Sequence, residues 1–244
     1  MKRPGFLAIS LTAALCTLAT FGRSQSPPET APTPAANAWM LTPTPYLEWN
    51  KDIASSLRAQ RDHFWDAAAP QHLPLTAPNS NMAVPEGGTF DRTQPEIGDV
   101  PNRVILTGTF TKHRSVLSSS EMSLYTEVTL RVDTVYDDES GLGHPFANND
   151  IALLLSGGTV KLRSGVTLTH NTPPRDLFLQ PDHKYLLVLS YQTNGDFYLV
   201  YDNWDISSGT ARANTYRTRY YASAGRSSLE GASVQQLGAV LSLQ

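Results

Sequence analysis

The sequence contains one cysteine in 244 residues, Cys16, and it lies in a largely apolar N-terminal run over residues 6–21. If this part of the chain is removed, no cysteine remains. Disulfides, zinc–thiolate sites and cysteine nucleophiles are then excluded together. A domain without such cross-links is held together by burial of an apolar core, and a chain of this length can form one.

Residues 1–24 predict a secretory signal peptide. Lys2 and Arg3 give a positive start, the apolar run follows, and a polar stretch then leads into prolines. The run is shorter than the ~20 residues of a membrane-spanning helix, and its flanks favour cleavage. The competing interpretation is lipid attachment at Cys16, which the bulky Leu15 directly before it disfavours. We therefore expect an exported protein, either periplasmic or secreted.

An excess of positive charge is also lacking. The formal net charge of −3 becomes −5 without Lys2 and Arg3, because all 22 acidic residues lie beyond the signal. A mildly acidic exported chain is a poor match for a polyanion, so we expect no nucleic-acid partner. No second stretch is long and apolar enough to span a membrane, so we expect no transmembrane segment after signal cleavage.

The common catalytic motifs are absent from the sequence. It has no Gly-x-Ser-x-Gly nucleophile elbow, no His-Glu-x-x-His zinc helix, no phosphate-binding Gly-x-x-x-x-Gly-Lys loop and no EF-hand calcium loop. These patterns are specific, and their joint absence counts against the common hydrolases and nucleotide enzymes. We therefore assign no catalytic residue, metal or cofactor.

The chain after the signal predicts one helix between two irregular segments. Residues 25–43 are rich in proline and alanine and indicate a spacer, and residues 70–100 hold five prolines and indicate a loop. Residues 44–69 between them have Thr44 as a cap and Pro45 at the first helical position. Helical spacing places four apolar residues on one face, which indicates docking against the rest of the protein rather than a ligand site. These residues are Trp49, Ile53, Leu57 and Phe64.

Residues 101–222 predict a β domain. Apolar and polar side chains alternate over residues 122–136, which is typical of a strand with one buried face. At ~3.3 Å per residue this strand would extend roughly 50 Å, so it must bend or coil, as barrel strands do. Residues 223–244 are expected to form a short C-terminal helix and tail. Further strands are expected over 104–110, 151–155, 160–169, 185–191, 197–201, 204–206 and 210–216, with a hairpin turn at Asn194-Gly195.

The segment over residues 104–209 resembles a group of exported bacterial proteins of uncharacterised function. The shared features are Gly108 after the first strand, the alternating strand 125–132, an apolar strand 153–158 that ends in two glycines, and the "YLLVL" strand 185–189. Such proteins are in turn similar to the netrin and tissue-inhibitor class of OB-like barrels. The resemblance covers a little under half of the chain. It implies a mainly β fold, a small OB-like barrel of five to six strands with an N-terminal helix and a short C-terminal helix.

The resemblance supports the fold and hardly informs the activity. Metalloprotease inhibitors of that class chelate the metal through an N-terminal cysteine inside a disulfide framework. The mature chain would have neither, so that mechanism does not carry over. OB-like folds hold quite different ligands, and the fold alone assigns no function.

Histidines and one polar loop are the remaining candidates for acid–base chemistry. No two histidines lie four residues apart on a helix, so a metal site would need distant ones to converge, and solvated positions are the simpler interpretation. His113, Ser115 and Glu121 could form a Ser/His/acid grouping around one loop, although such groupings also arise by chance. The six histidines are His63, His72, His113, His144, His170 and His183.

An acidic run follows the long strand. Oxygen-rich loops can hold calcium, but the irregular spacing favours solvated turns, so no metal is assigned here either. The residues are Asp137, Asp138, Glu139, Asn148, Asn149 and Asp150.

A basic and aromatic stretch near the C-terminus is the candidate ligand site. Arginines interleaved with tyrosines can stack on bases or sugars, or pair with anionic polymers. In a strand, Arg217 and Arg219 would share one face, with Tyr216 and Tyr220 on the other. Inward tyrosines and solvated arginines are therefore the competing interpretation. We take Arg217, Arg219 and Tyr220 as candidate ligand-binding residues.

Together these features favour a non-enzymatic binding or interaction module in the bacterial envelope or outside the cell. Its partner would be a protein or an envelope polymer. The first alternative is a hydrolase that acts on an envelope polymer, with a site assembled from loops around His113 and Glu121. The second is a structural protein of envelope assembly, which would expose a large apolar patch on the Trp49/Phe64 helix face.

Overall fold

The computed structural model describes residues 38–69, 74–76, 99–142, 150–170, 179–213 and 231–236. All of them belong to one compact unit, Pro34–Gln244. The predicted signal peptide, the spacer up to residue 37 and most of the proline-rich loop lie outside the described residues. So does most of the predicted C-terminal helix. Among the described helices, none is long and apolar enough to cross a membrane.

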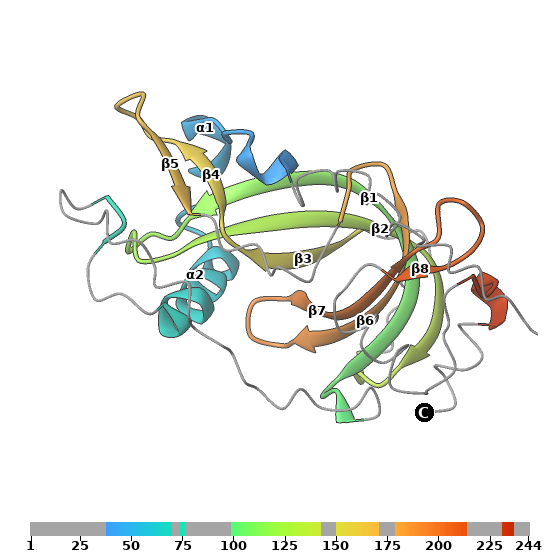
Figure 1. Ribbon diagram of the computed structural model, residues 1–244. Helices are drawn as coiled ribbons and strands as arrows, with labels where there is room; N and C mark the ends of the chain where they lie inside the picture. Colours follow the sequence, from blue (N-terminus) through green and yellow to red (C-terminus); the bar gives the residue numbers. More distant parts are fainter. Residues whose placement is uncertain are drawn as a thin grey trace, which may run out of the picture. The chain divides into compact units, whose positions relative to one another are not determined.

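The described residues form mainly β structure, as the sequence predicts (Figure 1). Three short helical elements precede the strands: η1 (Ala38–Leu41), α1 (Tyr46–Trp49) and α2 (Ser56–Ala68). The strands are β1 (Arg103–Leu117), β2 (Leu124–Asp138), β3 (Asp150–Ser156), β4 (Gly158–Lys161), β5 (Thr167–His170), β6 (Lys184–Gln192), β7 (Phe197–Asp205) and β8 (Arg212–Ala213).

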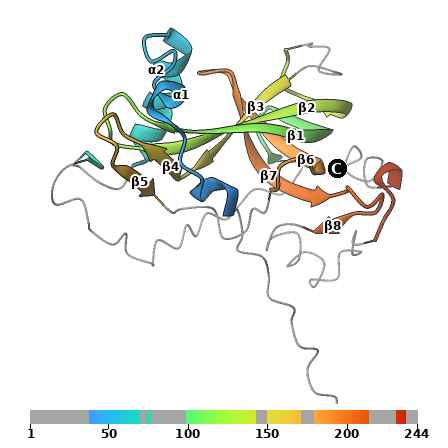
Figure 2. The ribbon, with the colours of Figure 1, turned by 90° about the horizontal axis from the view of Figure 1, so that it is seen from above.

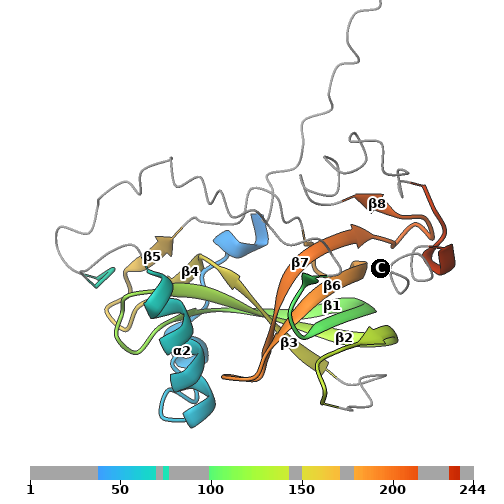
Figure 3. The ribbon, with the colours of Figure 1, turned by 90° about the horizontal axis from the view of Figure 1, so that it is seen from below.

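Five of these strands close into a ring. Their order is β3-β2-β1-β6-β7, and β3 also pairs with β7, while β8 extends the sheet beyond β7. The named pairings are antiparallel except the closing one, which is parallel and joins Leu153 to Tyr198. The ring therefore closes through one residue pair, midway along β3. Figure 1 shows the curvature of β1 and β2 that brings the remaining strands round, and Figures 2 and 3 show the same strands from above and below.

The long strand predicted over residues 122–136 is present as β2, two residues later. It pairs with β1 over its full length, but the two strands take different second partners. Residues 103–109 of β1 pair with β6, and residues 125–131 of β2 pair with β3. Three register shifts interrupt the β1–β2 ladder, and such bulges increase local bending and twist.

Gly108 lies at one of these shifts, where β1 passes close to β2. A Cβ atom at this position would come within 2.7 Å of the Leu130 side chain and 2.8 Å of the Arg131 carbonyl oxygen. The second of these atoms belongs to the backbone and cannot rotate away. Any side chain at residue 108 would therefore push the two strands apart at the bend.

The core lies inside the ring, where alternate residues of all five strands meet. Met40 from η1 and Leu179, which precedes β6, join the same cluster. The ring interior is lined by Val104, Leu106, Phe110, Val128, Leu130, Val132, Ile151, Leu153, Leu155, Tyr185, Leu187, Leu189, Tyr191 and Tyr198.

The strand predicted over residues 160–169 is instead a hairpin of two short strands, β4 and β5. The chain turns at Gly165, whose φ of 88° suits glycine. The other edge of β4 receives Thr44, whose backbone nitrogen donates to the Thr159 carbonyl at 2.9 Å. The N-terminal segment is thereby attached to β4, and the Trp49 indole adds a hydrogen bond to the Lys161 carbonyl.

The single helix predicted over residues 44–69 was wrong in two respects. The chain breaks after α1 into turns in which Asp52 adopts a φ of 60°, and α2 begins only after Ser55, whose side chain accepts from the Arg58 backbone nitrogen. Of the predicted apolar face, Ile53 and Leu57 are each 38% exposed. The buried residues of α2 are charged, because this helix docks through its polar face: Arg58, Arg61 and Asp62.

We predict that Gly108→Ala lowers the free energy of unfolding by about 1–3 kcal/mol or more, because the added methyl group overpacks the bend. Gly141→Ala is the control, since Gly141 has open space around it and its φ of 72° adds only a local backbone cost. Urea unfolding followed by circular dichroism measures both. An equal or smaller loss for Gly108→Ala would contradict the packing role of this glycine.

Candidate functional site

The candidate ligand-binding residues Arg217, Arg219 and Tyr220 lie outside the described residues, in the segment between β8 and residue 231. Their prediction therefore stays a prediction. The described residues concentrate their polar contacts at two other places. One lies beneath α2, and the other lies at one end of the ring interior.

A buried ion pair attaches α2 to the hairpin between β1 and β2. Arg58 and Asp62 are each 3% exposed, and their side chains meet at 2.8 Å. Asp62 also accepts from the Tyr125 hydroxyl at 2.8 Å and from the Ser119 backbone nitrogen at 2.9 Å. Each Nη atom of Arg58 donates one hydrogen bond, to the Trp49 and Leu117 carbonyl oxygens respectively. Both charges thus have hydrogen-bond partners besides each other, which is the condition under which a buried pair is tolerated.

A second arginine of α2 reaches the turn between β6 and β7. Arg61 donates to the carbonyl oxygens of Gly195 and Asp196, and it forms a 3.0 Å ion pair with Glu127 of β2. The other carboxylate oxygen of Glu127 accepts from Arg114 of β1. One carboxylate thereby joins α2 to two strands and, through Arg61, to the β6–β7 turn.

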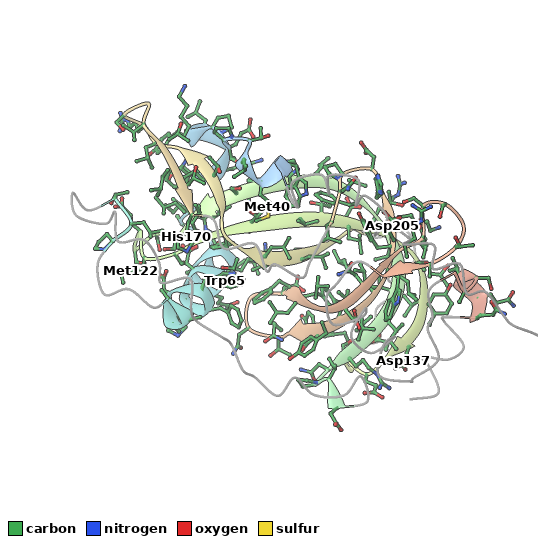
Figure 4. All side chains as sticks on the ribbon, viewed as in Figure 1. Met40, Trp65, Met122, Asp137, His170 and Asp205 are labelled. Carbon is green, nitrogen blue, oxygen red and sulfur yellow. The ribbon has the colours of Figure 1, made fainter. Side chains whose placement is uncertain are left out.

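Aromatic rings fill the space around these charges. Phe64 meets Phe197 edge to face at 5.1 Å, and Trp65, labelled beside α2 in Figure 4, stacks on Tyr125 at 6.2 Å. Burial, and the nearby carboxylates of Asp62 and Glu127, raise the pKa of Tyr125 despite the opposing charge of Arg58. The tyrosine therefore stays neutral and serves as a hydrogen-bond donor. This region holds α2 in place. Of the predicted docking face, Trp49 and Phe64 do pack in this region, and buried charges take the part that Ile53 and Leu57 were expected to play.

The residues of the hypothesised Ser/His/acid grouping are held in separate contacts. The ring of His113 lies against Trp39 and Phe110, and burial lowers its pKa. Glu121 occupies the β1–β2 turn and accepts from the Thr76 hydroxyl. Ser115 is fully buried and shares a hydrogen bond with the Thr126 hydroxyl.

The acidic run after β2 is partly neutralised by one arginine. Arg103 reaches Asp137 at 2.9 Å and Glu139 at 2.7 Å. Asp138 instead accepts from the Ser140 backbone nitrogen at the following turn. Within the described ranges, no group of three or more histidine, cysteine or acidic side chains is placed to hold a metal ion. Asn148 and Asn149 lie outside those ranges.

Four polar residues lie on one face of the β6–β7 ladder, at one end of the ring interior. Tyr185 is paired with Asp205 across the ladder and Leu187 with Asn203, so these side chains face the same way. His183 precedes Tyr185 by two residues and meets Asp205 at 2.7 Å. Burial tends to raise the pKa of Asp205, but hydrogen bonds from His183 and Ser207 outweigh it and hold the pKa below its ordinary value. Figure 4 labels Asp205, well apart from Asp137.

Sequence patterns missed this polar end of the ring. The sequence predicts His183 at a solvated loop or strand end, and it is partly exposed just before β6, but its contact with Asp205 is not foreseen. The strand pattern also predicts a break at residues 202–203, between strands 197–201 and 204–206. The structure has a single strand there, β7, with a register shift in its pairing to β6. A polar pair inside an otherwise apolar strand was the signal that could have identified Asn203.

Comparisons with known proteins find no relative. No family model matches the chain, and neither a curated protein nor a solved structure matches it.

We predict that Asp62→Ala lowers the free energy of unfolding by about 3–5 kcal/mol, because it leaves the Arg58 charge buried and unpaired. The control is Asp66→Ala, which removes hydrogen bonds only to the hydroxyls of Ser120 and Ser123 and should cost about 1 kcal/mol. The double variant Arg58→Met, Asp62→Leu should recover most of the loss. Chemical unfolding measures all three, and equal losses for the two single variants would contradict the role of the buried pair.

Proposed function

We propose that the protein is an exported, non-enzymatic binding module with an OB-like barrel, and that it holds a protein or an envelope polymer. The connectivity of the ring supports the OB-like barrel in this proposal, whereas the binding role rests on the basic and aromatic stretch of the sequence described below. The spatial order β6-β1-β2-β3 is that of a Greek key, and the fifth strand, β7, closes it. A five-stranded Greek-key barrel is the architecture of OB-folds, which bind extended polymers such as oligosaccharides.

The use of charge in the described residues supports binding rather than catalysis. Arg61, Arg103 and Arg114 are engaged in ion pairs that join elements of the fold, and Arg58 forms a buried pair with Asp62 within α2. His113 and Glu121, around which a hydrolytic site was hypothesised, make contacts with different partners. The proposal of export rests on residues 1–24, and the proposed kinship with netrin and tissue-inhibitor barrels rests on the resemblance of residues 104–209.

The site of capture is proposed to be the basic and aromatic stretch with Arg217, Arg219 and Tyr220. Positive charge combined with aromatic rings suits an anionic or sugar-containing polymer even when the whole chain is mildly acidic. This combination gives a local attraction that the net charge of the protein does not reveal.

The test is cross-linking capture from an envelope extract of the source cell, with the mature chain as bait. We expect one protein or polymer to be captured by the wild type and lost in the variant Arg217→Ala, Arg219→Ala, Tyr220→Ala. The control is Arg131→Ala, Arg163→Ala, which removes the same positive charge from two exposed positions and should retain capture.

Two other outcomes are informative. Capture that survives the triple variant would contradict the assigned site and keep the module. Leu47→Ser with Val166→Ser would then be the next variant, because these two side chains are 84% and 59% exposed and apolar. The absence of any specific capture by the wild type would contradict the binding function itself.

A further inference from the structure

The polar residues at the end of the ring grade from exposed to fully buried. The side chains of His183 and Asp205 are 38% and 18% exposed. Tyr185 and Asn203, which face the same way from the same ladder, have no exposed surface. These four side chains therefore form a row that starts at the solvent and ends at the buried amide of Asn203.

Asn203 is the unusual member of this set. Both its amide nitrogen and its amide oxygen are buried and have no hydrogen-bond partner. Among the described residues, three other side chains have an unpaired buried atom, but each lacks one partner only: Trp65, Thr159 and Trp204. A buried amide without partners is costly, because it loses its hydrogen bonds to water and gains none in return. Such a group in a core position points to a partner that is not part of the chain.

The neighbours of Asn203 determine how such a partner would reach it. Its cross-strand partner is Leu187, and the diagonal neighbour is Tyr185, whose hydroxyl accepts from the Gln180 backbone nitrogen at 2.7 Å. Gln180 follows Leu179, which is fixed by a hydrogen bond from the Trp39 indole to its carbonyl oxygen. This segment therefore covers the Tyr185 hydroxyl, and a small molecule would reach Asn203 by local opening of it.

We propose that Asn203 is the floor of a small ligand site inside the ring, which takes a neutral group presenting a hydrogen-bond donor beside an acceptor, as a primary carboxamide does. An asparagine amide offers two donors and one acceptor oxygen, so a second carboxamide complements it with two parallel hydrogen bonds. A charged group would lose too much hydration in this apolar interior to bind. The site is separate from Arg217, Arg219 and Tyr220, and it does not depend on what they bind.

The carboxamide could belong to a small solute or to an asparagine or glutamine of a partner. Two probes distinguish these sources: acetamide, and the peptide Gly-Asn-Gly. N-methylacetamide is the matched control probe, because its only N–H points away from its carbonyl oxygen and cannot form the paired contact.

The experiment follows the side-chain amide signals of Asn203 by NMR while each probe is added to the mature protein. We expect a saturable shift with acetamide or the peptide and a weaker response to N-methylacetamide. Binding to Asn203→Leu should be at least about tenfold weaker, and it is compared with the wild type through the backbone amide signal of the paired residue Leu187. The absence of a saturable shift with both acetamide and the peptide would overturn the proposal. So would a water molecule that stays on Asn203 at saturating probe.

Stability without ligand gives an independent readout. Asn203→Leu is close in size and removes the unpaired amide, so its melting temperature should rise by at least about 2 °C. Leu187→Asn, at the paired position, should lower it. A fall for Asn203→Leu would show that the amide has a partner in the folded chain and would overturn the proposal. If this variant does not fold, the titration of the wild type still decides.

Discussion

The bend of the β1–β2 ribbon is the constraint on which the rest of the structure depends. Two strands of 15 residues cannot stay straight in a domain of this size, and each must serve two different neighbours. Close approach at Gly108 and the register shifts around it let β1 turn toward β6 while β2 continues toward β3. Only then does β7 reach β3, so the ring, its core and the polar end of its interior follow from this bend.

The outer face of the same ribbon is stabilised differently. Inside the ring, apolar side chains from all five strands supply the burial, whereas α2 docks outside through Arg58, Asp62 and Arg61. Charges held in this way need every partner in place, which makes the position of the helix specific. Inside the ring, by contrast, the side-chain amide of Asn203 is buried without any hydrogen-bond partner in the chain. The charges beneath α2 therefore have a structural role, whereas we attribute the unpaired amide of Asn203 to ligand binding.

The regular parts of the fold could be predicted from the sequence. Period-two alternation identified β2 to within two residues, and Asn194-Gly195 correctly predicted the turn between β6 and β7. Helical spacing failed at residues 44–69, because the apolar residues used for it include Ile53 and Leu57 on the exposed side. Long-range contacts of Arg58, Asp62 and Arg61 with the strands decide which face of α2 is buried, and local spacing carries no information about them.

The candidate sites likewise divide into residues that a local sequence pattern identifies and residues that only the folded structure brings together. Arg217, Arg219 and Tyr220 were identifiable because their composition is unusual, and they remain a prediction. The role of Asn203 could not be predicted, since its position inside the ring depends on the register shift in β7 and on the pairing with Leu187. His183 and Asp205 lie 22 residues apart and meet only when the β6–β7 hairpin forms.

Closure of the ring can be measured directly by NMR. In the labelled mature protein, the backbone protons of Leu153 and Tyr198 should give a nuclear Overhauser effect, because the parallel contact of β3 and β7 brings these residues together. A closed ring should give this effect. Its absence, with the β1–β2 and β6–β7 ladders intact, would indicate an open sheet and contradict both the proposed OB-like barrel and the proposed site at Asn203.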